Sequence, residues 1–134
     1  MKKTDAQQTA NDYRELFRVT FEQGAVGMAI RDIGPSASHW KLVNDKFCDI
    51  FGYTREEMLQ MTSIDVTHPE EKHIAIKFNQ QLIQGETGSY SREKRYVRKD
   101  GQILWANTWL SPIPGPDGNP NQLFQVLEDI SLRK

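Results

Sequence analysis

One cysteine and three histidines are the side chains in this sequence best suited to metal binding, haem ligation or nucleophilic chemistry. Cys48 and the histidines at positions 39, 68 and 73 do not have the spacing at which metal ligands occur in zinc sites. A single cysteine cannot form an intramolecular disulfide, which favours a reducing cytoplasm. Because Cys48 lies beside Phe47 in an apolar stretch, we interpret it as a small buried residue rather than a nucleophile. The sequence therefore predicts no metal centre.

Paired carboxylates and glycine-rich loops are two further features that could perform chemistry. The acidic pairs at residues 56–57 and 70–71 stand at the starts of expected helices, where the helix dipole favours anions without any catalytic role. Gly115 and Gly118 lie among prolines, which lack the N–H donors that a phosphate-binding loop needs. We therefore expect that this chain is not an enzyme.

Overall charge and hydropathy exclude two more classes of function. The 134 residues include 17 basic and 18 acidic side chains, so no basic field is available to attract nucleic acid. No apolar run approaches the roughly 20 residues of a membrane-spanning helix, and residues 1–12 lack the apolar centre of a signal peptide. We expect one cytoplasmic domain with an ordinary core, no nucleic-acid partner and no direct membrane insertion.

The hydrophobic pattern predicts an amphipathic helix at residues 11–24, after a disordered polar stretch at residues 1–10. Tyr13, Leu16 and Phe17 follow helical spacing, with charged residues between them. This apolar stripe must pack either on the sheet of the same chain or on the same helix of a second chain.

Two strands, at residues 27–33 and 40–43, are expected to form a hairpin around a turn at residues 34–36. Alternation along the first strand places Met28 and Ile30 on one face of the sheet and Arg31 on the other. We expect the face with Met28 and Ile30 to point into the domain.

Three helices are expected after the hairpin, at residues 46–51, 54–61 and 67–85. Gly52 suits the left-handed position that ends the first helix, and threonine-x-x-glutamate capping boxes precede the other two. The third is the long helix, in which apolar residues recur every four positions.

Three strands complete the chain, at residues 90–98, 103–112 and 122–130. An Asp-Gly turn joins the first two, and a longer loop rich in proline and glycine joins the last two. This order predicts an α+β fold, with helices packed on one face of a five-stranded antiparallel sheet.

Several stretches, in this order, resemble the sequence signatures of PAS domains of the S-box type found in bacterial signalling proteins. The resemblance extends over about residues 13–134, and it implies a PAS core at residues 25–134 that ends at an output-linker signature. The stretches that resemble the family are Val43-Asn44-Asp45-Lys46-Phe47, Phe51-Gly52-Tyr53-Thr54, Asp65, His68-Pro69-Glu70-Glu71, residues 93–101, Trp105 and Glu128-Asp129-Ile130-Ser131.

The resemblance implies a sensory input domain that relays ligand binding to a C-terminal effector, such as a histidine kinase or a cyclic-dinucleotide enzyme. A second hypothesis is a ligand-free domain that acts as a dimerisation or protein-interaction scaffold. Fold alone does not decide between them.

Similar PAS domains bind flavin or haem, and each cofactor requires particular residues. Light-sensing relatives bear a reactive cysteine just before the long helix, and residues 61–67 contain none, which excludes covalent flavin photochemistry. Haem-binding relatives place a histidine on the long helix, but His73 shares its helical face with polar neighbours. We therefore expect no cofactor, neither flavin nor haem bound through His73.

The PAS resemblance also implies a pocket between the sheet and the long helix. Such a pocket would suit a small, mostly apolar ligand, although the same side chains could simply fill the core. The residues expected to bind the ligand are Met28, Ile30, Phe47, Phe51, Met58, Ile64, Ile74, Phe78, Leu82, Tyr96 and Asn107.

Two surface regions are expected to transmit the signal. Aromatic and apolar residues of the N-terminal helix and the outer sheet face predict a homodimer. The family's terminal signature is expected to relay the signal, and the charged run at residues 92–99 is interpreted as a solvated strand face with cross-strand ion pairs. The predicted interface residues are Tyr13, Leu16, Phe17, Phe21, Trp105 and Trp109, and the relay residues are Asp129, Ile130 and Ser131.

Overall fold

The structure, a computed structural model, describes residues 4–33, 39–85 and 88–134. The expected turn at residues 34–36 lies outside this part of the chain. The elements in chain order are α1 (Asp5–Gln23), β1 (Gly27–Asp32), β2 (Trp40–Val43), α2 (Asp45–Phe51), α3 (Arg55–Leu59), α4 (Ser63–Val66), η1 (Pro69–Glu71), α5 (Lys72–Ile83), β3 (Tyr90–Val97), β4 (Ile103–Pro114), β5 (Pro120–Asp129) and η2 (Ser131–Arg133).

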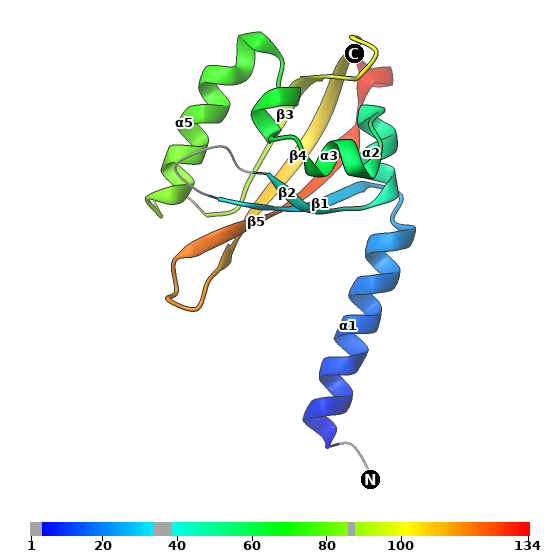
Figure 1. Ribbon diagram of the computed structural model, residues 1–134, viewed down its shortest axis with the longest axis vertical. Coiled ribbons are helices and arrows are strands. Elements are labelled where there is room, and N and C mark those ends of the chain that lie inside the picture. The colour runs from blue at the N-terminus through cyan, green and yellow to red at the C-terminus, as the bar shows by residue number, and fades with distance from the viewer. Residues whose placement is uncertain (1–3, 34–38, 86–87) are drawn as a thin grey trace.

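A five-stranded antiparallel sheet in the order β2-β1-β5-β4-β3 forms the centre of the fold. The helices α2, α3 and α5 lie together on one side of it, whereas α1 projects away from the body of the domain (Figure 1). The predicted α+β class and the five strands are therefore confirmed. In the described residues, none of the helices has the length and apolarity that crossing a bilayer requires.

The N-terminal helix begins at Asp5 rather than at residue 11. Thr4 and Gln7 form a capping box, in which the Gln7 amide donates to Thr4 Oγ1 at 3.1 Å and the Thr4 amide donates to Gln7 Oε1 at 2.9 Å. This cap satisfies donors of the first turn, so residues 5–10, which were expected to be disordered, are helical. Only Phe21, near the end of α1, is buried in the domain.

The side chain of Asn44 forms hydrogen bonds to α1, to the segment before β1 and to α2. Its side-chain oxygen accepts from the Phe47 amide at the start of α2, and its amide nitrogen donates to the carbonyl groups of Phe21 and Val26. Gly52, with φ of 83°, ends α2 in the left-handed conformation that the sequence predicts. The junction between α1, the sheet and α2 is thus fixed by hydrogen bonds as well as by packing.

The segment before the long helix differs from the prediction. An additional short helix, α4, begins after Thr62, whose amide donates a hydrogen bond to Asp65 Oδ2 at 2.9 Å. Thr67 does not cap the next helix, because its hydroxyl donates to a carbonyl of α4. His68 takes the capping role instead, and its Nδ1 accepts from the Glu70 amide at 3.1 Å.

Candidate functional site

A cavity lies between the inner face of the sheet and α5. About 430 Å³ of space within it is not filled by atoms, part of it open to solvent. Only about 30 Å³ of it can hold the centre of a water molecule, so the cavity is much smaller than the roughly 300–1,000 Å³ common for small-molecule sites. Its lining residues are Arg31, Ser63, Ile74, Ala75, Phe78, Asn79, Tyr90, Arg92, Lys94, Tyr96, Thr108, Leu110 and Gln125.

Three of the predicted ligand-binding residues line this cavity, namely Ile74, Phe78 and Tyr96. Phe78 stacks against Tyr90 with 4.4 Å between ring centroids, and together they form an apolar wall. The apolar side of the predicted pocket is therefore present on α5 and β3.

Five other predicted residues lie elsewhere. Phe47, Phe51 and Met58 are fully buried in the core cluster beneath α2 and α3, where they pack against other side chains. Leu82 belongs to a second core cluster, and Ile64 on α4 does not reach the cavity although its neighbour in sequence, a serine, does.

The prediction that Met28 and Ile30 of β1 point into the domain is wrong. Ala29 and Arg31 are buried on the inner face, and Met28 and Ile30 lie on the outer one. The reason is the approach of α2, because a Cβ added to Gly27 would lie 3.1 Å from the Cα of Phe47. The inner face next to α2 accommodates glycine and alanine, and this fixes the alternation of the whole strand.

Alternation along β4 likewise places Asn107 on the outer face of the sheet, away from the site. It pairs across the sheet with Glu93, which is exposed, and therefore points outward. Its neighbour Thr108 points inward and is buried. The polar groups of β4 in the cavity thus come from Thr108 rather than from Asn107.

Arg31 is the charged residue most deeply enclosed at the site. Its exposed fraction is 3%, and its Nη2 donates to Asn79 Oδ1 on α5 at 3.0 Å. Its Nε and Nη1 are buried and have no hydrogen-bond partner in the described part of the chain. Burial lowers the pKa of Arg31 to about 10, so the guanidinium stays charged at neutral pH.

Lys94 and Arg92 add positive charge from β3. Lys94 has an exposed fraction of 8%, and its Nζ lies 4.7 Å from the centroid of the Tyr96 ring. Burial, assisted by the nearby charges of Arg92 and Arg31, lowers the pKa of Lys94 to about 7. The lysine therefore titrates near neutral pH.

Glu71 is the carboxylate that faces this cluster. Its Oε1 lies 3.4 Å from Arg92 Nη1, its Oε2 lies 3.7 Å from Arg95 Nε, and it also accepts from the Arg95 amide. No aspartate or glutamate lines the cavity among the residues described, so its wall has excess positive charge.

A chain of neutral polar groups crosses the floor of the cavity. Gln125 Oε1 accepts from Trp40 Nε1 at 3.3 Å, and Gln125 Nε2 donates to Tyr96 at 3.4 Å and to Thr108 at 3.3 Å. Burial raises the pKa of Tyr96, which keeps its hydroxyl neutral and available as a donor. These groups offer hydrogen bonds to a ligand.

The cationic lining was missed because the charged run on β3 was interpreted as a solvated face. A period of two places Arg92 and Lys94 on the same side as Tyr96, and that alternation was the available signal. For Arg31, no signal was available, because a single arginine between apolar residues is usually exposed.

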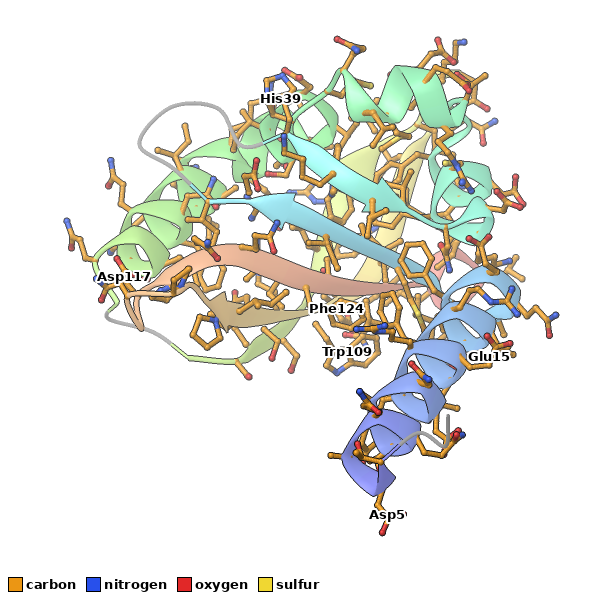
Figure 2. All side chains as sticks on the ribbon, turned by 60° about the horizontal axis from the view of Figure 1, so that its bottom comes forward. Asp5, Glu15, His39, Trp109, Asp117 and Phe124 are labelled. Atoms are coloured by element: carbon orange, nitrogen blue, oxygen red, sulfur yellow. The ribbon has the colours of Figure 1, made fainter. Side chains whose placement is uncertain are left out.

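The predicted interface residues occupy an uncovered surface. On α1, Leu16 is 62% exposed and Tyr13 and Phe17 are exposed as well. On the outer sheet face, Trp109 is 40% exposed, and Figure 2 shows it beside Phe124. No described segment of the chain covers this pair.

Phe21 and Trp105, the remaining predicted interface residues, are covered by their own chain. Phe21 is 5% exposed and stacks on Phe17 with 5.4 Å between ring centroids. Trp105 is partly enclosed by Arg95, whose guanidinium carbon lies 5.6 Å from its ring centroid, and by Lys134, whose Nζ lies 4.9 Å from it.

The predicted relay residues are held against the sheet. Ile130 is buried and donates its amide to the Trp105 carbonyl, and the Ser131 hydroxyl accepts from the Trp105 amide. Asp129 pairs with Arg98 at 2.8 Å, and Arg98 also donates to the carbonyl of Ile50 at the end of α2. The C-terminal end of the sheet is therefore connected to the helical layer.

Other residues weighed for chemistry lie away from the cavity. His73 is exposed on α5, and Cys48 is buried in the core cluster, where burial raises the pKa of its thiol. Within residues 4–33, 39–85 and 88–134, no three histidine, cysteine or acidic side chains come together as a metal site.

Comparison with known proteins gives consistent matches. The model of the PAS fold family matches residues 41–126. A probable diguanylate cyclase of Escherichia coli is 34% identical over 118 residues, which are 88% of this chain and 10% of that protein. A sensor histidine kinase of Ectopseudomonas mendocina is 27% identical over 94% of this chain and 12% of its own length. A blue-light-activated histidine kinase of Rhizobium johnstonii is 29% identical over 80% of this chain and 31% of its own length.

The chain therefore spans between about a tenth and a third of the length of these curated relatives. Among solved structures, the PAS domain of a Colwellia psychrerythraea protein matches with a TM-score of 0.76 at 20% identity, over 91% of this chain and 100% of that one. A light-oxygen-voltage protein of Rhodobacter sphaeroides matches with a TM-score of 0.72 at 17% identity, over 90% and 68% of the two chains. These structural likenesses show the fold.

The prediction that no cofactor binds is corrected by these matches. Light-oxygen-voltage proteins are prominent among the matching structures, one of them studied with a flavin analogue, and one curated relative is activated by blue light. The reasoning was wrong because the missing cysteine at residues 61–67 bears on a covalent bond to flavin, and non-covalent binding needs no cysteine.

Proposed function

The chain belongs to the PAS fold family, and from this premise we propose that it is the sensory input domain of a larger signalling protein. A small molecule binds in the cavity between the sheet and α5, and its binding is passed to a C-terminal effector. The family match and the signalling relatives support the sensory role. Members of this family are signalling modules, so catalysis belongs to the effector and not to this domain.

The cavity is the single observation on which the ligand-binding proposal depends. One wall is apolar, formed by Ile74, Phe78 and Tyr90, and the opposite side presents hydrogen-bonding and charged groups. A ligand with an apolar body and a polar head would match both sides. This differs from the mostly apolar ligand that the sequence predicted.

We propose that the signal leaves through the end of β5. A ligand between α5 and the sheet would shift the packing of β3 and β4 against α5. The backbone of Trp105 on β4 is hydrogen-bonded to the Ile130 amide and to the Ser131 hydroxyl. Asp129 and Arg98 connect the same point to α2. A ligand can bias this packing only if it binds one arrangement more tightly than the other.

The relatives include a probable diguanylate cyclase and two histidine kinases, and this supports an enzyme of one of these two classes as the effector. A cyclic-dinucleotide enzyme or a histidine kinase would receive the signal, as in the proteins that share this domain. A reducing cytoplasm is the proposed setting, because Cys48 is the sole cysteine and is buried as a thiol.

The second candidate function is a dimerisation scaffold. The uncovered apolar residues of α1 and the outer sheet face favour it, because large contiguous apolar surfaces commonly mark protein interfaces. The two functions are compatible, since a dimeric sensor uses both surfaces.

Mass spectrometry of the purified chain, under native and then denaturing conditions, tests the ligand-binding function. A retained compound that is released on denaturation is the expected result, and a visible absorption spectrum of the same sample identifies a bound flavin or haem. A chain that contains no compound, and whose melting temperature responds to no small molecule in a broad library, would leave only the scaffold function.

A further inference from the structure

Among the described residues, Arg31 has one hydrogen-bond partner, in a place where a charged group needs more. Its guanidinium is buried, and Asn79 satisfies only one hydrogen of its Nη2. Nε and Nη1 have no partner among the described residues. An isolated buried charge is strongly unfavourable, so this arrangement is suited to receiving an acceptor from outside the chain.

The free donors of Arg31 match a carboxylate in geometry. Nη2 bears two hydrogens, one parallel to the Nε hydrogen and the other parallel to one of the Nη1 hydrogens. Whichever of them Asn79 occupies, the other edge of the guanidinium still presents two parallel N–H groups. A carboxylate binds such an edge with two hydrogen bonds.

The charges around Arg31 favour an anion as well. Lys94 and Arg92 line the same cavity, and Arg31 and Arg92 lie close enough to lower the pKa of Lys94. Glu71 is already shared between Arg92 and Arg95, so it does not neutralise the wall next to Arg31. An anionic ligand would offset the repulsion between these cations.

The rest of the cavity favours an organic anion over an inorganic one. Phe78, Tyr90 and Leu110 form an apolar surface within the same cavity. The side chains of Phe78 and Leu110 offer no hydrogen bonds to the remaining oxygens of a phosphate ion, but they would bury a hydrocarbon or aromatic body. Only about 30 Å³ of the cavity can hold the centre of a water molecule, and this restricts that body to a small group.

We propose that the cavity binds a small organic carboxylate, whose carboxylate group pairs with Arg31 and whose apolar body lies against Phe78, given that the domain senses a small molecule as proposed above. Lys94 and Arg92 supply the surrounding positive charge. Tyr96 and Gln125 provide neutral hydrogen bonds on the floor of the cavity.

Isothermal titration calorimetry with matched pairs of acids and amides tests this assignment. The probes are acetate and acetamide, benzoate and benzamide, phenylacetate and phenylacetamide, and inorganic phosphate, at constant ionic strength. At least one acid should bind at least about tenfold more tightly than its amide and than phosphate, because the charged hydrogen bonds exist only with the acid.

Three variants locate the site. Arg31→Met should weaken binding of that acid by at least about tenfold, and Asn79→Asp should do the same by placing a carboxylate of the protein itself on Arg31. Arg14→Met, on the exposed part of α1, should leave binding unchanged. The Asn79→Asp variant and the comparison of acid with amide in the unaltered protein keep the test decisive even if Arg31→Met fails to fold.

The results that would contradict the carboxylate assignment differ from those that would contradict the proposed sensory function. Amides that bind as tightly as acids, or phosphate that binds more tightly than every acid, would overturn the carboxylate assignment. The sensory function would then survive if Ala75→Trp, which fills the cavity, abolishes binding of those probes. If no probe binds and the purified chain retains no compound, both proposals fail.

Discussion

Among the described residues, the buried cations Arg31 and Lys94 form no ion pair with a carboxylate. Arg31 and Lys94 are enclosed on the inner face of the sheet, and Glu71 is the carboxylate that faces them. Buried charges without ion-pair partners reduce stability, and the role proposed for these two cations is in ligand binding.

The first prediction concerns the pH dependence of stability. The pKa of Lys94 is about 7 in the folded domain against an ordinary value of 10.5. Between these values the unfolded chain binds the proton and the folded chain does not, so the free energy of unfolding should rise with pH, by at most about 1.4 kcal/mol per pH unit. Lys94→Met should remove this rise.

Urea denaturation at a series of pH values from about 7 to 9 measures the slope, and the range stops below the titration of tyrosine. Lys46→Met, at an exposed position of α2, is the control and should retain the slope of the unaltered protein. A flat profile in the unaltered protein would show that Lys94 is not desolvated as described.

The second prediction concerns Glu71, which accepts from the Arg95 amide and pairs with Arg92. Glu71→Gln keeps the size of the side chain but removes its charge, so the free energy of unfolding should fall by about 3 kcal/mol. Chemical denaturation checks this against Glu56→Gln, an exposed position at which we expect a change within about 0.5 kcal/mol. Equal effects in the two variants would mean that Glu71 does not stabilise the cationic wall.

At the scale of elements, the packing of α2 on β1 decides which side chains reach the cavity. Gly27 lies directly beneath Phe47, with 3.1 Å between its added Cβ and the Cα of that residue. This contact sets the alternation that turns Arg31 inward and Met28 outward. The position of the site is therefore determined by a helix that does not itself line it.

Gly27→Val tests this contact. The added side chain would meet the backbone of α2, and overpacking of this kind costs about 1–3 kcal/mol. Gly88→Ala is the control, because a Cβ there meets nothing within 4 Å. Thermal unfolding of both variants should show a loss of stability only for Gly27→Val, and equal stability would argue against the tight junction.

The sequence was sufficient for the fold and for one wall of the site. Hydrophobic periodicity and caps such as Asn44 and Gly52 predicted the strands and most helices, because these signals are local. The face of β1 was not predictable, because Met28 and Ile30 are as suitable for a core as Ala29. Their direction depends on the distant α2, which no local pattern reveals.

At the scale of the whole molecule, the apolar surface on α1 and the outer sheet face is uncovered and large side chains dominate it. α1 extends away from the domain and buries only Phe21 (Figure 1). A second copy of the chain would cover both surfaces at once, and this is the proposed homodimer.

Size-exclusion chromatography with light scattering should give a mass of twice 15.5 kDa. Leu16→Glu and Trp109→Glu should each shift the protein towards the monomer, because each places a charge in the proposed apolar interface. Gln60→Glu, exposed at the end of α3, should leave the mass unchanged. A monomer at all concentrations would remove the scaffold function and leave the sensory one.

A crystal structure of the unaltered protein with the tightest-binding probe shows whether the space between α5 and the sheet is a ligand site. We expect density for the probe between Phe78 and the sheet, with its polar group within hydrogen-bond distance of Arg31. This expectation would be contradicted by a probe bound elsewhere, with the cavity occupied only by water or closed by the side chains that line it.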